Sequence, residues 1–233
     1  MKVFDSLLYN NMPDLGLDKV YTIYDSWVFD EDQDRSTELP NRQKTVDRFR
    51  RAEELNQLCC IDIESWPYIG QKDAVLQESV DRMLEVISWA REEAPSLRIG
   101  WFARPMINFP PYVLDDSLAD RLEQGKHFAE PIAREVDVYF PSIYPQMQSI
   151  DEWLVYADKV LATHPHDKPV IPFIRPHFTS RAGVDDGTPI PIWYWAAILA
   201  FFESRGLDIV LWGGFRQEWE ENTFWGRVCS YGI

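Results

Sequence analysis

Short, nearly continuous apolar runs alternate along the chain with longer stretches in which apolar residues recur every three or four positions. Short runs of this kind are typical of parallel β-strands that are covered on both faces. They lie at residues 19–24, 58–64, 97–103, 136–144, 169–175 and 207–213, with a weaker one at residues 2–8. We therefore predict about seven strands.

The longer stretches have the 3.6-residue period of amphipathic helices. The apolar positions of the first helix are Leu76, Val80, Met83, Ile87 and Ala90; those of the second are Ile150, Trp153, Leu154, Ala157 and Leu161; those of the third are Leu118, Leu122 and Ile132. Ser149 and Glu152 form a capping box at the start of the second helix, and Gly125 interrupts the third. The apolar stretch at residues 190–202 predicts a buried helix, with Gly206 in the position of its C-terminal cap.

The alternation of strands and helices predicts an α/β fold with a parallel sheet. We favour a TIM-like (β/α) barrel, distorted with about seven strands, because regularly spaced strands leave no clear second domain within residues 1–233. The prediction is thus a single barrel domain. An open doubly wound sheet is the alternative, although the chain lacks the Gly-x-Gly-x-x-Gly fingerprint that accompanies many such sheets.

Composition and charge exclude several classes of protein. The chain has 38 acidic and 23 basic residues, a net charge of −15 and no basic run, which argues against a duplex nucleic-acid binder. No segment reaches the roughly 18 apolar residues that a membrane-spanning helix requires. The three cysteines form neither a disulfide framework nor a zinc-ligand spacing, and we expect no metal or organic cofactor. No signal peptide is visible, so we expect either a cytoplasmic protein or the mature form of an exported one.

The strongest candidates for chemistry are the carboxylates of Asp62 and Glu64 at the end of a predicted strand. In a strand these side chains point to the same face, roughly 6.5–7 Å apart along the chain, and Ile61 and Ile63 point to the other face. Pro67 then ends the strand, which places the acids at the open mouth where barrel enzymes carry their active sites. Like charges this close raise the pKa of one member and provide a proton donor beside an anion, as glycoside cleavage requires. The alternative is a pair of solvated acids that caps the next helix.

Aromatic residues make up 14% of the chain, with 10 Trp, 10 Tyr and 13 Phe. Some of them lie at or near strand ends, where a sugar would be held, although each is equally compatible with simple packing. Our candidates for this role are Trp66, Trp101, Tyr139 and Trp212, with Tyr144 as a hydroxyl donor. The remaining helical tryptophans, Trp89, Trp153, Trp193 and Trp195, are expected mainly in the core.

Arg104 and Arg175 fall at strand ends despite the acidic composition. One interpretation is that they form ion pairs with Asp62 or Glu64. The other is that they recognise an acidic group of the substrate.

Four segments, taken in order, resemble the hyaluronidase family of the bee-venom and mammalian type. They are Asp62-Ile63-Glu64 followed by Trp66-Pro67, the stretch at residues 139–144, the stretch at residues 169–173, and Gly206 followed by residues 209–213. Their order and approximate spacing agree over residues 58–213. The resemblance implies a distorted barrel with seven strands.

The resemblance also implies a retaining, substrate-assisted mechanism on N-acetylhexosaminides. Glu64 would protonate the leaving glycosidic oxygen and later activate water. The acetamido carbonyl of the substrate would be the nucleophile, and Asp62 would orient and stabilise it. Tyr144 would donate a hydrogen bond near that acetamido group, and Trp212 would form the wall of the subsite.

The chain also departs from that family. Phe102 and Phe178 stand where the family carries tyrosines, and the cysteines of its flanking disulfides are missing. Together with the net charge of −15, which repels a polyanion, the two lost hydroxyls argue against hyaluronan itself as the substrate. Family 18 chitinases also end a strand with Asp-x-Glu, but they carry a further Asp where this chain has Cys60.

Two other functions fit the sequence. The first is a catalytically inactive barrel that binds a glycan or a protein partner, with its acids neutralised by Arg104 and Arg175. The second is an ordinary two-carboxylate glycosidase in which Asp62 or Glu218 is the nucleophile or base.

Overall fold

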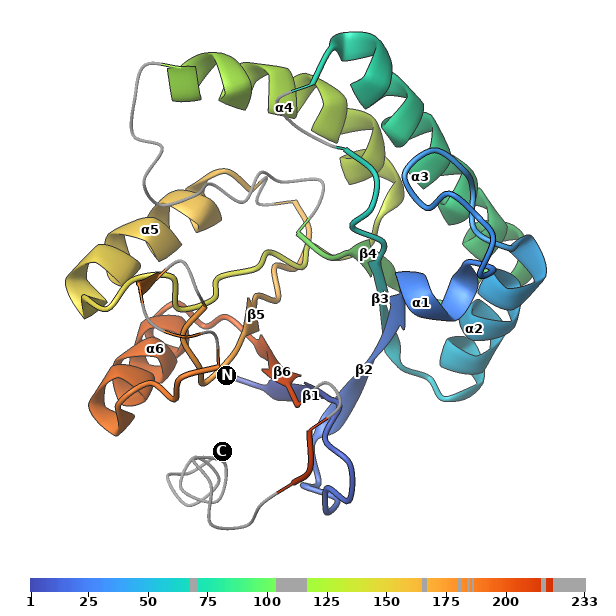
Figure 1. Cartoon of the computed structure of the whole chain (residues 1–233). Helices are drawn as coiled ribbons and strands as arrows, with labels where there is room; N and C mark the ends of the chain where they lie inside the picture. Colours follow the sequence, from blue (N-terminus) through green and yellow to red (C-terminus); the bar gives the residue numbers. More distant parts are fainter. Residues whose placement is uncertain are drawn as a thin grey trace. The chain divides into compact units, whose positions relative to one another are not determined.

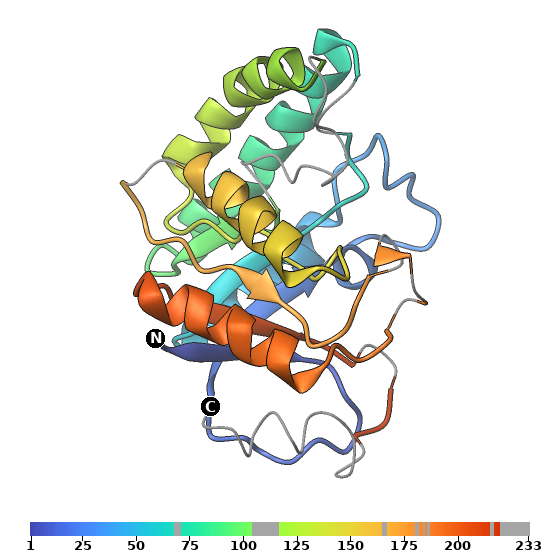
Figure 2. The same ribbon diagram turned by 90° about the vertical axis from the view of Figure 1, so that its left-hand side faces the viewer.

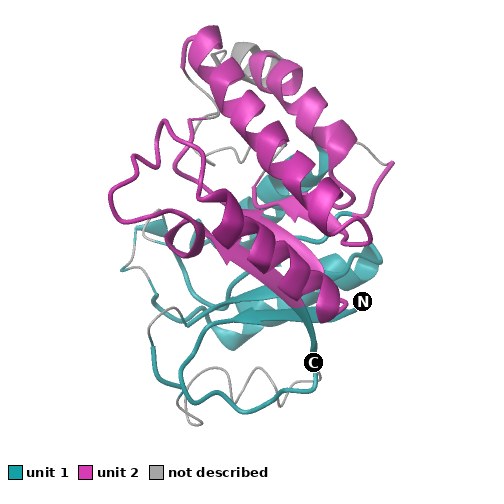
Figure 3. Cartoon of the chain, turned by 90° about the vertical axis from the view of Figure 1, so that its right-hand side faces the viewer, with its two compact units in different colours: residues 1–19, 142–162, 170–233 teal, residues 20–141, 163–169 magenta. Residues whose placement is uncertain are grey.

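The structure is a computed structural model, and it describes residues 1–67, 71–103, 117–164, 167–179, 182–183, 185, 187–214 and 217–219, with the backbone alone for residues 117–123. The chain divides into two compact units, shown in Figure 3. Unit 1 comprises residues 1–19, 142–162 and 170–233, and unit 2 comprises residues 20–141 and 163–169. The single domain of the sequence analysis stays a prediction.

Six parallel strands are labelled in Figure 1. They are β1 (Val3–Leu7), β2 (Asp18–Tyr24), β3 (Leu58–Asp62), β4 (Ile99–Trp101), β5 (Phe173–Ile174) and β6 (Ile209–Gly213). Their hydrogen-bonded order is β4-β3-β2-β1-β6-β5, and every ladder between them is parallel. Because helices connect most of the strands, the predicted α/β class is confirmed.

For two of the predicted strands, the strength of the sequence signal does not match the strand that forms. The weak candidate at residues 2–8 forms β1, which pairs with β6 over five residues. The stronger candidate at residues 136–144 forms no continuous strand and makes only single bridges, from Phe140 to Phe102 and from Ser142 to Phe173. Pro141 explains this difference, because proline has no N–H to donate to a ladder.

Unit 1 packs α5 (Ile150–Ala162) and α6 (Ile192–Ser204) together, and Figure 2 shows them next to each other. The ring of Trp153 is fully buried and makes edge contacts with Tyr194, Phe201 and Phe202. One of the two bonds of the predicted capping box is present, because the Ser149 hydroxyl accepts a hydrogen bond from the Glu152 N–H at 3.4 Å. Gly206, with φ of +63°, follows α6 as predicted.

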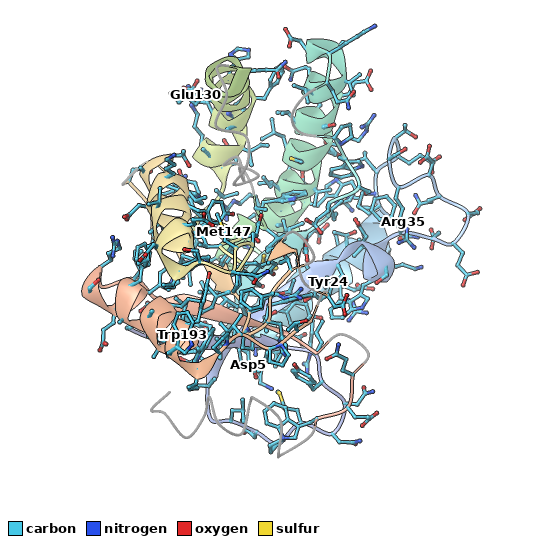
Figure 4. All side chains as sticks on the ribbon, turned by 60° about the vertical axis from the view of Figure 1, so that its left-hand side comes forward. Asp5, Tyr24, Arg35, Glu130, Met147 and Trp193 are labelled. Carbon is cyan, nitrogen blue, oxygen red and sulfur yellow. The ribbon has the colours of Figure 1, made fainter. Side chains whose placement is uncertain are left out.

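The helical tryptophans follow the prediction with one exception. Trp89, Trp153 and Trp195 are buried, whereas Trp193 on α6, labelled in Figure 4, is 57% exposed. The helix predicted as buried, α6, therefore leaves this one tryptophan exposed, while the other three lie in the core as expected. Hydrophobicity alone gives no direction for a side chain on a helix that is apolar on every face.

Unit 2 contains α1 (Asp25–Val28), α2 (Arg42–Glu54), α3 (Asp73–Glu93) and α4 (Ser117–Glu135). The helix α3 packs against both α2 and α4. The predicted interruption at Gly125 is wrong, because α4 runs continuously past this residue and even contains Pro131. A glycine within a helix costs only about 1 kcal/mol relative to alanine, and packing on α3 offsets such a cost.

None of the helices in the described residues is both long enough and apolar enough to span a membrane.

Candidate active site

The two predicted catalytic carboxylates lie in unit 2, at the carboxyl end of β3. Asp62 is the last residue of this strand and is half-buried, and Glu64 is exposed two residues later. Ile61 and Ile63 are fully buried. This alternation agrees with the prediction that the acids share one face and the isoleucines the other.

Tyr24 belongs with this face, and the sequence analysis missed it. In the ladder between β2 and β3, Tyr24 pairs directly with Asp62. Directly paired residues of neighbouring strands project to the same side of a sheet. Tyr24 is half-buried at the end of β2, where Figure 4 labels it, and its ring meets the edge of Trp27 at 5.0 Å.

Asp25 is a second residue that the sequence analysis missed. Its carboxylate accepts hydrogen bonds from the backbone N–H groups of Glu64 and Ser65, and the Ser65 hydroxyl donates to it at 3.4 Å. Burial raises the pKa of Asp25, and these hydrogen bonds oppose the rise. An acid directly after the predicted end of a strand carries no sequence signal for such a contact, because the contact joins segments 40 residues apart.

Trp66 and Trp101 have a different role from the one predicted. They are 1% and 0% exposed, and their ring centroids lie 6.0 Å apart inside unit 2. The Trp101 indole N–H donates to the Ile63 carbonyl at 3.4 Å, and that of Trp66 donates to the Glu38 carbonyl at 3.1 Å. Buried rings have no surface for a sugar, so we withdraw them as substrate contacts and assign them to the support of the β3 end.

The register of the strands explains the burial of Trp101. This residue pairs with Ile61 in the ladder between β3 and β4. It therefore shares the buried face of Ile61 and not the face of Asp62.

The adjacent thiols of Cys59 and Cys60 are fully buried and reduced. Burial raises the pKa of both, and the negative charges of Asp62 and Glu64 raise that of Cys60 further. A thiol is nucleophilic only as the thiolate, so neither cysteine is a nucleophile.

Unit 1 brings together three residues that the sequence analysis selected from separate strand ends. The rings of Tyr144 and Trp212 are stacked, with centroids 5.8 Å apart and planes inclined by 25°. The guanidinium carbon of Arg175 lies 5.8 Å from each centroid, within cation–π range. The same guanidinium donates to the carbonyls of His177 at 3.3 Å and Phe178 at 2.9 Å. We call these three residues the aromatic–arginine cluster; each is partly exposed.

Tyr139, which we predicted to contact a sugar, does not have this role in the structure. It is 0% exposed, and its hydroxyl donates to Asp167 Oδ1 at 3.3 Å. Burial and the nearby Asp167 charge raise the pKa of Tyr139 to about 12. Asp167 belongs to the loop between α5 and β5, so the hydroxyl is directed to the segment that enters β5 and not to the carboxyl end of a strand. Tyr139 is thus a packing residue.

The remaining predicted residues are Arg104 and Glu218. Arg104 lies outside the described residues. Glu218 is in unit 1, where its carboxylate accepts hydrogen bonds from the side-chain amides of Asn10 at 3.0 Å and Asn11 at 2.6 Å. This contact joins the loops that follow β1 and β6.

Two other features bear on the chemistry. Among the described residues, no group of three or more His, Cys, Asp or Glu side chains could hold a metal ion. A pocket of about 650 Å³ in unit 1 lies between the amino end of β1, residues 16–18 and one side of α6. None of the predicted site residues that the structure describes lines this pocket.

Two of the solved structures that resemble this chain are of bee venom hyaluronidase. The monoclinic crystal structure matches at 17% sequence identity with a TM-score of 0.54, and the match covers 91% of this chain and 90% of that chain. The complex with a hyaluronic acid tetramer matches at 17% identity and a TM-score of 0.54, over 88% and 82% of the two chains. The mannohexaose complex of Thermomonospora fusca β-mannanase has a TM-score of 0.44, which is too low to support an argument. No family model and no curated protein matches the chain.

At 17% identity the likeness shows the fold alone. Together with the parallel strand order, it confirms the predicted distorted (β/α) barrel, a fold that glycoside hydrolases share. The hyaluronidase type stays a prediction.

Proposed function

We propose that this protein is a glycoside hydrolase that cleaves an N-acetylhexosamine-containing glycan by a retaining, substrate-assisted mechanism. The observation that carries the proposal is the pair Asp62 and Glu64 at the carboxyl end of β3, with the first half-buried and the second exposed. Glu64 is the general acid and base, since it can reach a substrate oxygen. Asp62 orients the acetamido group, whose carbonyl oxygen attacks the anomeric carbon.

The aromatic–arginine cluster supplies the substrate contacts in this proposal. Trp212 presents an apolar ring for the C–H face of a sugar, and Tyr144 donates a hydrogen bond near the acetamido group. Arg175 fixes the position of both rings through its cation–π contacts. Arg175 and Trp212 follow or end parallel strands, and barrel enzymes carry their sites at such ends, which supports this role for the cluster.

The first experiment is the turnover of N-acetylglucosamine and N-acetylgalactosamine oligosaccharides by the wild type and by Glu64→Gln. Loss of a general acid is expected to lower turnover roughly 10²-fold or more. Glu54→Gln is the matched control, since Glu54 is an exposed glutamate at the end of α2 that pairs with Arg51. Equal turnover of wild type and Glu64→Gln would end the catalytic assignment.

A second experiment separates the substrate-assisted mechanism from the two-carboxylate alternative. Substrate assistance needs the acetamido carbonyl, so the N-deacetylated oligosaccharides are expected to resist cleavage. NMR of the first product is expected to show the retained anomer. Cleavage of deacetylated substrate, together with a large loss of turnover in Glu218→Gln, would favour the two-carboxylate glycosidase instead.

The inactive barrel is the remaining alternative, and binding without turnover is its signature. A glycan that binds with equal affinity to the wild type and to Glu64→Gln, and that neither cleaves, would support it.

A further inference from the structure

We propose that Tyr9 is a positioning residue for Trp212, an inference that rests on the proposed role of Trp212 as a sugar contact. Trp212 is followed directly by Gly213 and Gly214. Glycine is the residue with the greatest conformational freedom, so this sequence by itself does not fix the backbone next to the indole ring. Residues 8–11, which follow β1, contact that backbone.

Backbone hydrogen bonds continue the pairing of β1 and β6 past the ends of both strands. They run from the N–H groups of Leu8, Asn10 and Trp219 to the carbonyls of Gly213, Gln217 and Asn10, at 2.9, 2.8 and 2.9 Å. Tyr9 lies between two residues that take part in these bonds. Its backbone is therefore held beside the chain that follows Trp212.

The Tyr9 ring lies directly against Gly214. Gly214 is buried and has a φ of +79°, in the left-handed region that favours glycine. A Cβ atom added at Gly214 would lie only 2.2–2.5 Å from three carbon atoms of the Tyr9 ring. The same ring meets that of Trp219 edge-on, with centroids 5.5 Å apart. The ring thus covers the turn that begins two residues after Trp212.

Side chains join the two segments as well. The Glu218 carboxylate accepts hydrogen bonds from the side-chain amides of Asn10 at 3.0 Å and Asn11 at 2.6 Å. Asn11 has a φ of +56°, a left-handed conformation that asparagine tolerates better than most residues. The segment that carries Tyr9 is therefore tied to the segment after β6 on both sides of Gly214.

These contacts hold the backbone next to Trp212, whereas Tyr144 and Arg175 contact its ring. A ring that is already in place when the glycan arrives binds more tightly, because ordering a side chain on binding costs affinity. Loss of the Tyr9 ring should therefore weaken glycan binding through Trp212. It should raise KM and leave kcat unchanged, since Trp212 contributes to binding and not to proton transfer.

The first test compares Gly214→Ala with the control Gly206→Ala. Alanine is strained at both positions, where φ is +79° and +63°, but nothing lies within 4 Å of a Cβ atom at Gly206. Calorimetry with an N-acetylglucosamine oligosaccharide, in the Glu64→Gln background, measures the affinity. We expect a loss of about threefold to tenfold in Gly214→Ala and none in Gly206→Ala. Equal losses would assign the effect to backbone strain and overturn the role of Tyr9.

The second test changes Tyr9 itself. Tyr9→Phe keeps the ring and should bind the oligosaccharide like the wild type, whereas Tyr9→Ala should bind it about threefold to tenfold more weakly. In a Trp212→Ala background, Tyr9→Ala should cause no further loss, because both residues act through one ring. A further loss in that background, or a loss in Tyr9→Phe, would overturn the proposal.

A third readout needs no glycan. It is the NMR signal of the Trp212 indole N–H, identified by its disappearance in Trp212→Phe. We expect this signal to shift in Gly214→Ala and Tyr9→Ala and to keep its position in Gly206→Ala and Tyr9→Phe. The indole N–H of Trp153, which is fully buried in the same unit, should not shift in any of them. If both signals change together, Tyr9 supports the unit as a whole, and its specific role is wrong.

The outcomes separate this inference from the proposed function. If Trp212→Ala leaves the oligosaccharide affinity unchanged, the proposed role of Trp212 fails, while the indole signals still decide whether Tyr9 positions its ring. If Trp212→Ala loses affinity but Gly214→Ala and Tyr9→Ala keep both the affinity and the Trp212 signal of the wild type, only the positioning role is wrong.

Discussion

The end of β3 in unit 2 and the aromatic–arginine cluster in unit 1 both follow strand ends, but they are built in opposite ways. At the end of β3, an exposed carboxylate is held by contacts beneath it: two buried indole rings and a carboxylate that binds backbone N–H groups. In the aromatic–arginine cluster, the partly exposed side chains hold one another by stacking and cation–π contacts.

The comparison teaches that the same residue type at a strand end serves two purposes. Trp101 lies on the face of β4 that pairs with Ile61 and is buried, whereas Trp212 on β6 stays partly exposed over Tyr144. A buried indole contributes to stability, and an exposed one contributes a surface. Substitution of a buried tryptophan should therefore lower stability, and substitution of an exposed one should lower binding.

The largest expected effect is that of Trp66→Ala. Replacing a fully buried tryptophan by alanine removes its packing and leaves a cavity, at a cost of about 3–5 kcal/mol in the free energy of unfolding. Urea unfolding followed by circular dichroism measures this cost. Trp66→Phe, which keeps an aromatic ring but loses the bond to the Glu38 carbonyl, should cost less. A loss below about 1 kcal/mol in Trp66→Ala would show that the indole is not a support of the β3 end.

Trp212→Ala should have the opposite effect, a small loss of stability and a clear loss of oligosaccharide binding. Because Trp212 is partly exposed, we expect a stability loss of only about 1 kcal/mol, the centre of the usual range for single substitutions. Loss of the ring face should weaken oligosaccharide binding about tenfold, a change of about 1.4 kcal/mol, measured by calorimetry with the Glu64→Gln variant to prevent turnover. Trp193→Ala, at an exposed tryptophan of the same unit, is the control. Unchanged affinity in Trp212→Ala would remove the cluster from the substrate site.

The smallest expected effect is on stability and concerns the buried carboxylate of Asp5. Asp5 on β1, labelled in Figure 4, is buried and accepts a hydrogen bond from the Leu7 N–H at 2.7 Å. Burial raises the pKa of Asp5, so the folded protein releases this proton at a higher pH than the unfolded chain. The ionised form is thus a cost to folding at neutral pH, and the cost disappears as the pH falls below the raised pKa.

Asp5→Asn should therefore be more stable than the wild type at neutral pH, with a gain that vanishes toward acid pH. Melting temperatures of both proteins between pH 4 and pH 8 measure this difference, given that the asparagine oxygen can still accept the Leu7 N–H. Asp32→Asn, at an exposed aspartate, should show no such trend. A gain that persists at acid pH would assign the effect to something other than the buried charge.

Local patterns predicted most of the fold. Apolar periodicity located α3 and α5, a continuous apolar stretch located α6, and short apolar runs located the six strands, because period and length depend on neighbouring residues alone. Two failures, at Gly125 and in residues 136–144, came from the same limit. Packing of α4 on α3 offset the glycine, and Pro141 interrupted the ladder of a run that is otherwise strongly apolar.

The sequence by itself determined where the acids Asp62 and Glu64 stand, since a buried strand that ends in Asp-x-Glu places both on one face and at its end. It also selected Tyr144, Arg175 and Trp212. Only the tertiary structure decided which aromatic rings are buried, that Tyr24 lies across from Asp62, and that Asp25 binds the backbone of Glu64. The physical reason is that burial and register arise from contacts between segments distant in the chain, and no local pattern records which segment will be the neighbour.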